Sequence, residues 1–374
     1  MTKLIKILIG IVVSLIAVVI AAAVLIPILV DPNDYKDEIT QQVYNQTGRT
    51  LTIEGNINLS VSLPLSVSLE LGKLELSNAE GFADKPFARM QSASLYVAIM
   101  PLLSANKLDI GKIKLAGMEL NLIKNKQGKT NWADLSGAQK VPTESKKTGS
   151  AKKDPSANKE PSANKGLPAI SVAGVNISDT VINWTDEQAG QSISLSKTNI
   201  SISELIEDKP FKLSITTHIN SIQPAIKGNF SLSSSPTISL SKQLFQLPST
   251  ELSVDLSGDT LPGGSNKTKL SGDIIFNGKS QQLDIKKMQL STYEMVINGL
   301  FHVEQLDSAA QFNGQVSIEQ FSPKKLAAVI GASLPKMKQD KALTSADAKI
   351  TFKGNQQSVT ISSLQANLDD TSLK

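Results

Sequence analysis

From Leu51 to Phe321 the sequence alternates apolar and polar residues, and this period of two limits the fold more than any other feature of the chain. Short runs with one apolar and one polar face are typical of β-strands that are covered on one side only. The same stretch contains almost no amphipathic helix, so helices cannot cover the apolar faces of these strands. We therefore predict a mainly β chain with few short helices.

An antiparallel sheet with one apolar face must cover that face, and two arrangements would do so. The sheet can fold onto itself as a sandwich or barrel, which the overall composition favours. Alternatively, it can curl into a groove whose apolar floor is covered by a ligand, which the low aromatic content of 4% slightly favours. The periodicity does not decide between them.

If the groove exists, apolar residues in the first strand runs are the candidates for its floor. They alternate with serine, lysine and other polar residues. The predicted lipid-facing residues are Leu59, Val61, Val67, Leu69, Leu95, Val97, Leu120 and Leu122.

The run Ile7–Val30 has no charged residue, and Ser14 is its only polar side chain. About 20 apolar residues suffice for a helix to cross a bilayer, so we predict a transmembrane helix over residues 7–30. Two lysines precede the run and several acidic residues follow it, which places residues 1–6 in the cytoplasm and the remaining chain outside. A cleaved signal peptide is the alternative, with Ala21-Ala22-Ala23 as its site, but signal peptides have apolar segments of only about 7–15 residues.

The rest of the chain divides into three parts. Residues 31–137 and 167–374 carry the strand pattern, while residues 138–166 are rich in lysine, proline and serine and predict a disordered insertion. Short helices are expected at two places. Asp31 or Asn33 can cap the start of the first, and Ser322 can cap the second, with Pro323 at its first helical position. The strand pattern continues to Lys374 without a closing element, so we expect the β-domain to be incomplete.

The composition argues against several classes of function. The formal net charge is only +4, and no aromatic cluster lies beside basic residues, so we expect no nucleic-acid partner. The chain has no cysteine and no familiar catalytic motif, and its two histidines, His218 and His302, are expected on polar strand faces. We therefore expect no enzymatic activity and no catalytic residue, metal or cofactor site.

Several segments resemble the AsmA family in order and spacing. The resemblance begins after the predicted anchor and extends to the end of the chain, although none of its motifs is catalytic. The matching segments are Val30–Lys36, Thr47–Leu51, Ile53–Ile57, Leu76–Phe82, Lys85–Ala88, Pro101–Leu103, Gly128–Trp132, Phe321–Pro323 and Leu368–Leu373.

This resemblance implies a single-pass protein of the bacterial inner membrane, with a large periplasmic domain and a role in outer-membrane biogenesis. It also implies an elongated antiparallel sheet curled into an apolar groove that binds or conducts phospholipid acyl chains between the two membranes. A different class stays open, in which the β-domain is an assembly factor that binds envelope proteins and influences the insertion of outer-membrane proteins. Exposed strand edges would recruit such partners.

Overall fold

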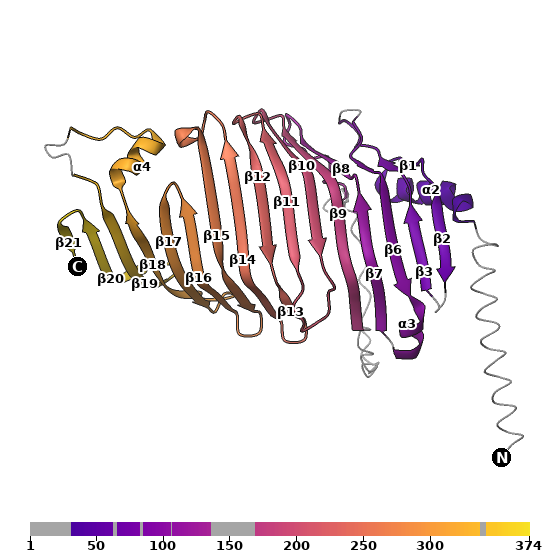
Figure 1. The fold of residues 1–374 in the computed structure, drawn as a ribbon. Coiled ribbons are helices and arrows are strands. Elements are labelled where there is room, and N and C mark those ends of the chain that lie inside the picture. The colour runs from indigo at the N-terminus through magenta and orange to yellow at the C-terminus, as the bar shows by residue number, and fades with distance from the viewer. Residues whose placement is uncertain (1–30, 63–65, 83–84, 106, 136–168, 337–341) are drawn as a thin grey trace, which may run out of the picture.

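The computed structural model describes residues 31–62, 66–82, 85–105, 107–135, 169–336 and 342–374. All of its strands belong to one 21-stranded sheet. Figure 1 shows the strands side by side, from β2 near the start of the described chain to β21 near its end. The prediction of a mainly β chain with few short helices is therefore confirmed.

The first eight strands form four long strands that are each interrupted once. Gly55 and Gly72 lie at two neighbouring interruptions, where a Cβ on either residue would collide with the backbone of the other. The strands are β1 (Leu51–Ile53), β2 (Ile57–Ser62), β3 (Ser66–Leu71), β4 (Leu74–Leu76), β5 (Ala88–Met90), β6 (Ser92–Ala98), β7 (Lys107–Ala116) and β8 (Glu119–Lys124).

These strands make two tiers that both attach to β9 (Ala169–Asp186). One tier is ordered β2, β3, β6 and β7, and the other is ordered β1, β4, β5 and β8. Strands β7 and β8 both run parallel to β9. The expectation of a purely antiparallel sheet is wrong at this point, because the long connection between β8 and β9 permits a crossover that a hairpin does not.

After β9 the sheet is an antiparallel meander that follows the order of the chain. Only β13 departs from this order, since it pairs with β14 beside the β12–β14 contact. The strands are β10 (Gln191–Ile202), β11 (Leu213–Ser221), β12 (Ile226–Ser234), β13 (Thr237–Ser239), β14 (Leu244–Ser257), β15 (Ser265–Asn277), β16 (Gln282–Thr292), β17 (Met295–Glu304), β18 (Gln311–Phe321), β19 (Ala346–Asn355), β20 (Val359–Leu368) and β21 (Thr371–Leu373).

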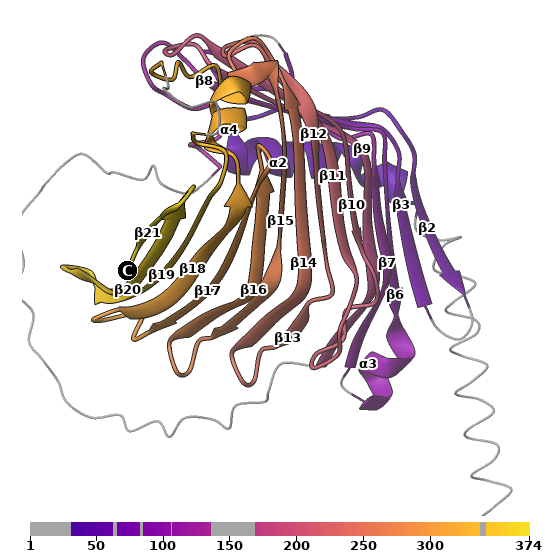
Figure 2. The same cartoon turned by 60° about the vertical axis from the view of Figure 1, so that its left-hand side comes forward.

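The long strands of the meander carry β-bulges, and the sheet is bent and twisted rather than flat (Figure 2). The register shifts beside Lys197, Ser249 and Lys287, and each of these residues has a positive φ of about 50°. A bulge inserts an extra residue into one strand, which bends that strand and increases its twist. These bulges on β10, β14 and β16 therefore contribute to the curvature of the sheet.

The helices lie at the margins of the sheet. The 3₁₀ helix η1 (Pro32–Tyr35) and helix α2 (Lys36–Thr47) follow Asp31, whose Oδ1 accepts a hydrogen bond from the Asn33 amide at 2.8 Å. A second short 3₁₀ turn, η2 (Pro262–Gly264), precedes β15. Helix α4 (Pro323–Ile330) is capped by Ser322, so both helices expected from capping residues are confirmed. Figures 1 and 2 place α2 and α4 at one margin and α3 (Ile99–Ala105) at the opposite margin.

The expectations for residues 7–30 and 138–166 concern segments outside the described residues. In the part of the chain that the structure describes, no helix is long and apolar enough to cross a membrane. Ile99 continues the apolar alternation of β6 but begins α3, because Pro101 lacks the N–H that a ladder needs. Figures 1 and 2 show the described strands as a single curved layer with no second sheet facing it, so a closed sandwich is not the fold of these residues.

Candidate functional site

A continuous row of apolar side chains crosses the whole sheet. Each member lies directly opposite the next across a strand pair, and every strand on its path contributes one residue. At roughly 4.8 Å per strand, this apolar row extends about 65 Å. Its members are Ile57, Leu71, Ala93, Leu115, Ile177, Ile200, Ile215, Leu232, Leu252, Leu270, Leu290, Ile297, Ile318, Ala348 and Ala366.

The neighbouring residue on each strand points to the other face, because successive side chains of a strand alternate. These neighbours form a second row that contains only polar and charged residues. The polar row comprises Asn58, Glu70, Ser94, Lys114, Asn176, Ser201, Ser214, Ser233, Glu251, Ser271, Gln289, Asn298, Ser317, Lys349 and Gln365. The two faces of the sheet therefore differ in chemistry from one end to the other.

All eight residues predicted from the sequence lie on the apolar face. Leu59, Leu69 and Leu95 are cross-strand neighbours in a row beside the apolar row. The second set, Val61, Val67 and Val97, continues through Ile110 to Val172 in a row nearer the α3 margin, which we call the margin row. The last two, Leu120 and Leu122, lie in the other tier opposite Ile182 and Trp184. Their contact with lipid stays a prediction.

Few apolar side chains of the described chain are buried. The buried ones are Ile57, Phe87, Phe211 and Ala327, each 5–8% exposed. Every other member of the apolar row is half-buried, as are the eight predicted residues. A soluble domain with this much apolar sheet surface would normally cover it, so the face is the strongest candidate for a binding surface.

The polar face carries shallow hollows of its own. One, of about 460 Å³, lies over β12, β14, β15 and β16 among serines and oppositely charged side chains, including Glu251, Lys267 and Lys269. Short serine side chains between long charged ones leave such space on a polar sheet. With both signs of charge around it, this hollow indicates no particular class of ligand.

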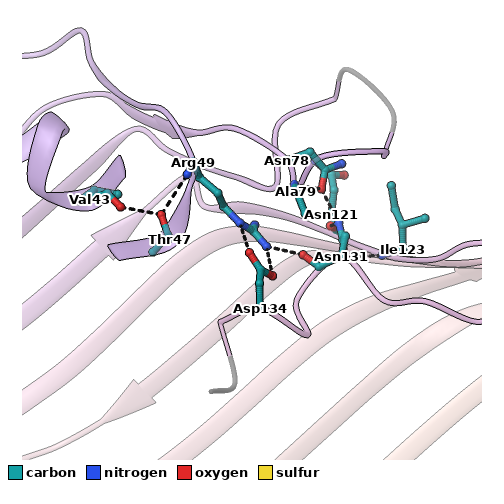
Figure 3. Close-up of polar contacts among 9 residues, drawn as sticks. All are labelled: Val43, Thr47, Arg49, Asn78, Ala79, Asn121, Ile123, Asn131 and Asp134. Atoms are coloured by element: carbon teal, nitrogen blue, oxygen red, sulfur yellow. Dashed lines mark hydrogen bonds and ion pairs between the residues drawn. The ribbon is translucent and has the colours of Figure 1, made fainter. Parts of the chain in front are cut away.

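A buried polar network lies at the end of β8, and Figure 3 shows its contacts. The Arg49 side chain is 1% exposed and donates from Nε and Nη2 to the two oxygens of Asp134, at 2.9 and 2.6 Å. Its Nη2 also donates to the Asn131 carbonyl at 2.5 Å, and its guanidinium carbon lies 4.5 Å from the centre of the Phe87 ring. The hydrogen bonds from Arg49 hold the pKa of Asp134 below its usual range.

Asn131 is the centre of the same network and is fully buried. Its side-chain Nδ2 donates to Oδ1 of Asn78 and to the Asn121 carbonyl, and its Oδ1 accepts from the Ile123 backbone N–H at 2.8 Å. The network ties residues near 49, 78 and 131 to β8 (Figure 3). We call this network the clip, and its role is structural. The sequence does not reveal it, because its segments are far apart in the chain and the residues next to each segment do not indicate that the segments meet.

Both histidines and Asp369 have structural partners. His302 Nδ1 lies 2.9 Å from Asp284 Oδ1, and His218 pairs with Asn229. Asp369 accepts hydrogen bonds from the Leu343, Thr344 and Ser345 amides, which lower its pKa. Across the described residues, no group of three or more histidine, aspartate or glutamate side chains is placed to hold a metal ion.

Comparison with known proteins agrees with this arrangement. A family model described as the AsmA family matches residues 1–374. The chain belongs to the AsmA family. A curated relative, Protein AsmA of Escherichia coli (strain K12), is 32% identical to it over 108 residues. That match covers 29% of this chain but only 17% of the relative, and no solved structure matches.

The structure shows what two of the AsmA-like segments contact. Thr47–Leu51 and Gly128–Trp132 are far apart in sequence, yet Arg49 from the first bonds to Asn131 from the second. Arg49 also bonds to Asp134, just beyond the second segment. These AsmA-like segments therefore build the clip, and Leu51 at the end of the first also lies in the cross-strand row that leads through Leu76 and Ala88 to Leu120.

Proposed function

We propose that this chain is a non-catalytic, inner-membrane-anchored protein of outer-membrane biogenesis that binds phospholipid acyl chains along its apolar sheet face and conducts them between the two membranes. AsmA family membership suggests a role in the envelope or in outer-membrane biogenesis. The lipid-binding role, the anchor at residues 7–30 and the periplasmic location of the sheet are the further steps of the proposal.

One observation carries the lipid-binding role. The apolar row is unbroken from Ile57 to Ala366, every member except the buried Ile57 is half-buried, and no second sheet faces the row in the described chain (Figures 1 and 2). Each methylene that leaves water for an apolar surface gains about 0.8 kcal/mol. An acyl chain lying on this face would cover the exposed leucine and isoleucine side chains along its path.

The same geometry argues for movement rather than a single fixed site. Successive positions of the row offer similar apolar side chains, such as Leu252, Leu270 and Leu290, so no position holds an acyl chain much more tightly than the next. Polar groups that would fix a lipid at one place lie on the opposite face. Lipid bound through its acyl chains would therefore shift along the row with small changes in free energy.

Photo-crosslinking in living cells tests the proposal. A photoreactive amino acid that replaces Leu270 should form phospholipid adducts. The same photoreactive amino acid in place of Ser271 is the matched control, because these neighbours point to opposite faces. Adducts at Leu270 that exceed those at Ser271 support the proposal. Equal yields at both positions, or no lipid at either in a folded protein, would overturn it.

A charge-substitution pair gives an independent readout. Val67→Asp places a carboxylate on the apolar face, whereas Ser68→Asp places it on the polar face of the same strand. Protease resistance is measured first, because an unpaired carboxylate at an apolar site can also unfold the domain. Among folded proteins, native mass spectrometry should find less co-purified phospholipid with Val67→Asp than with Ser68→Asp.

An assembly factor is the second candidate function, and the edge of β20 favours it. In the described chain, β20 pairs with β21 only at Ala366, Asn367 and Leu368. Val359 and Ile361 on the same strand are 64% and 59% exposed. A sheet edge of this kind can accept a strand from another protein. Crosslinking from Val359 discriminates between the two functions, since protein adducts there without lipid adducts at Leu270 favour the assembly factor.

A further inference from the structure

Helix α3 is a short apolar helix at a margin of the sheet. Its sequence, Ile-Met-Pro-Leu-Leu-Ser-Ala, contains no charged residue, and Met100 is 47% exposed. Figures 1 and 2 both place it at the margin opposite to α2 and α4. A charge-free helix that leaves a large side chain in water requires an explanation, as does the turn between β13 and β14, where Leu240 is 67% exposed.

The Ser104 hydroxyl, which belongs to the polar side chain of α3, has a partner within the helix. Pro101 lies in the first turn, where the missing N–H costs no hydrogen bond. The Ser104 hydroxyl donates to the Met100 carbonyl at 2.7 Å. Transfer of this helix from water into an apolar medium would therefore leave its hydroxyl paired, which lowers the penalty for burying that group.

Helix α3 also lies where the apolar face reaches the margin. It begins at Ile99, directly after β6, and the margin row places Val97 on that strand beside Val67 and Ile110. Tyr96 precedes Val97 and is 39% exposed, with its ring over Gly111 on the polar face. Tyrosine is enriched where proteins meet the headgroup region of a bilayer, because its ring is apolar and its hydroxyl is wet.

We propose that α3 is a membrane-docking element that inserts into the headgroup and upper acyl region of a lipid bilayer and brings the margin row to the bilayer surface. The occupant is a bilayer rather than a protein groove, because the helix offers neither charges nor side-chain hydrogen bonds to specify a partner. This inference rests on the proposed function, since docking at this margin would give acyl chains a direct path onto the apolar face.

The test uses the absence of cysteine from the chain. A single cysteine is introduced by Met100→Cys into the full chain and labelled with an environment-sensitive fluorophore. The protein is reconstituted in vesicles of phosphatidylethanolamine and phosphatidylglycerol. The quencher is a nitroxide attached to a membrane-spanning peptide, which an acyl-chain site on the sheet cannot extract from the bilayer.

Leu300→Cys is the matched control, because Leu300 is also 47% exposed but lies on the polar face of β17. We expect quenching at position 100 to exceed that at position 300 by about twofold or more, with a blue-shifted emission. Equal quenching at the two positions, or a blue shift at position 100 without quenching, would overturn the inference, and the latter result would indicate that position 100 is buried against protein.

The outcome is separable from that of the proposed function. Quenching at position 100 without lipid adducts at Leu270 would mean that α3 docks on the bilayer but the apolar face conducts no lipid. Lipid adducts at Leu270 without quenching at position 100 would leave lipid binding intact and remove α3 as the docking element.

Discussion

Arg49 and Asp134 lie 85 positions apart in the sequence and form a two-point ion pair in which the cation is buried and the anion is partly in water. The Arg49 side chain is 1% exposed and that of Asp134 is 37% exposed. The pair joins the turn after α2 to the segment after β8. Because their exposure differs, the two partners should differ in what their loss does to stability.

We predict that Asp134→Asn destabilises the folded protein by about 3 kcal/mol, because it leaves a buried guanidinium without its carboxylate. The double variant Arg49→Met, Asp134→Asn should lose less than the sum of the two single changes, since residues that share an interaction are not additive. Urea unfolding of all four proteins measures this coupling. Additive losses would mean that the ion pair contributes nothing beyond the packing of Arg49.

The depressed pKa of Asp134 predicts an acid-sensitive contribution to stability. A carboxyl whose pKa is lower in the folded state stabilises that state above its unfolded pKa of about 4, and the contribution is lost as the pH falls through the folded value. The stability difference between the natural protein and Asp134→Asn should therefore shrink when unfolding is measured at pH 3 instead of pH 7. Other aspartates are present in both proteins, so their titration cancels in this comparison.

Gly314, on the apolar face of β18, is a second position at which a substitution should destabilise the folded protein. A Cβ there would lie 2.8 Å from Phe352 Cζ, 2.9 Å from the Leu300 carbonyl oxygen and 3.1 Å from Phe301 Cδ1. Gly314→Ala should therefore lower the free energy of unfolding by about 1–3 kcal/mol through overpacking. Adding Phe352→Leu should recover part of that loss. If Phe352→Leu recovers no stability, the collision with the Leu300 carbonyl oxygen, and not that with the Phe352 ring, causes the loss.

The topology proposed for the chain is tested at Ser201, an exposed member of the polar row. After Ser201→Cys the chain has a single thiol, because the sequence has no other cysteine. A membrane-impermeant thiol reagent should label it from the periplasmic side of intact inner membranes. Labelling only after the cytoplasmic side is opened would reverse the orientation proposed for the residues after Val30.

The alternation of apolar and polar residues predicted which face each side chain takes, and for that reason Val61, Val67 and Val97 could be assigned to one surface from the sequence. Side-chain direction in a strand is a local property. Strand partners are not local, so the parallel pairing of Lys107 with Ala169 was not foreseen.

Capping side chains likewise predicted the helices that follow Asp31 and Ser322, because the cap is formed by adjacent residues. Helix α3 was missed because Ile99 continues the apolar alternation of β6 up to the point where Pro101 ends it. The clip at Arg49 was also missed, since its partner at Asp134 is brought to it only by the complete tier of strands.

Beyond β9, most strands pair with their immediate neighbours in the chain, and this order makes the domain extensible in fixed units. Adding one strand to a meander would reverse the direction of every strand that follows, whereas adding a hairpin would preserve it. A hairpin would lengthen the apolar row by roughly 10 Å, at about 4.8 Å per strand, and would disturb only the two strands on either side. Stability in such an array is close to a sum over neighbouring units, so the length of the sheet can change during evolution without redesign of the rest.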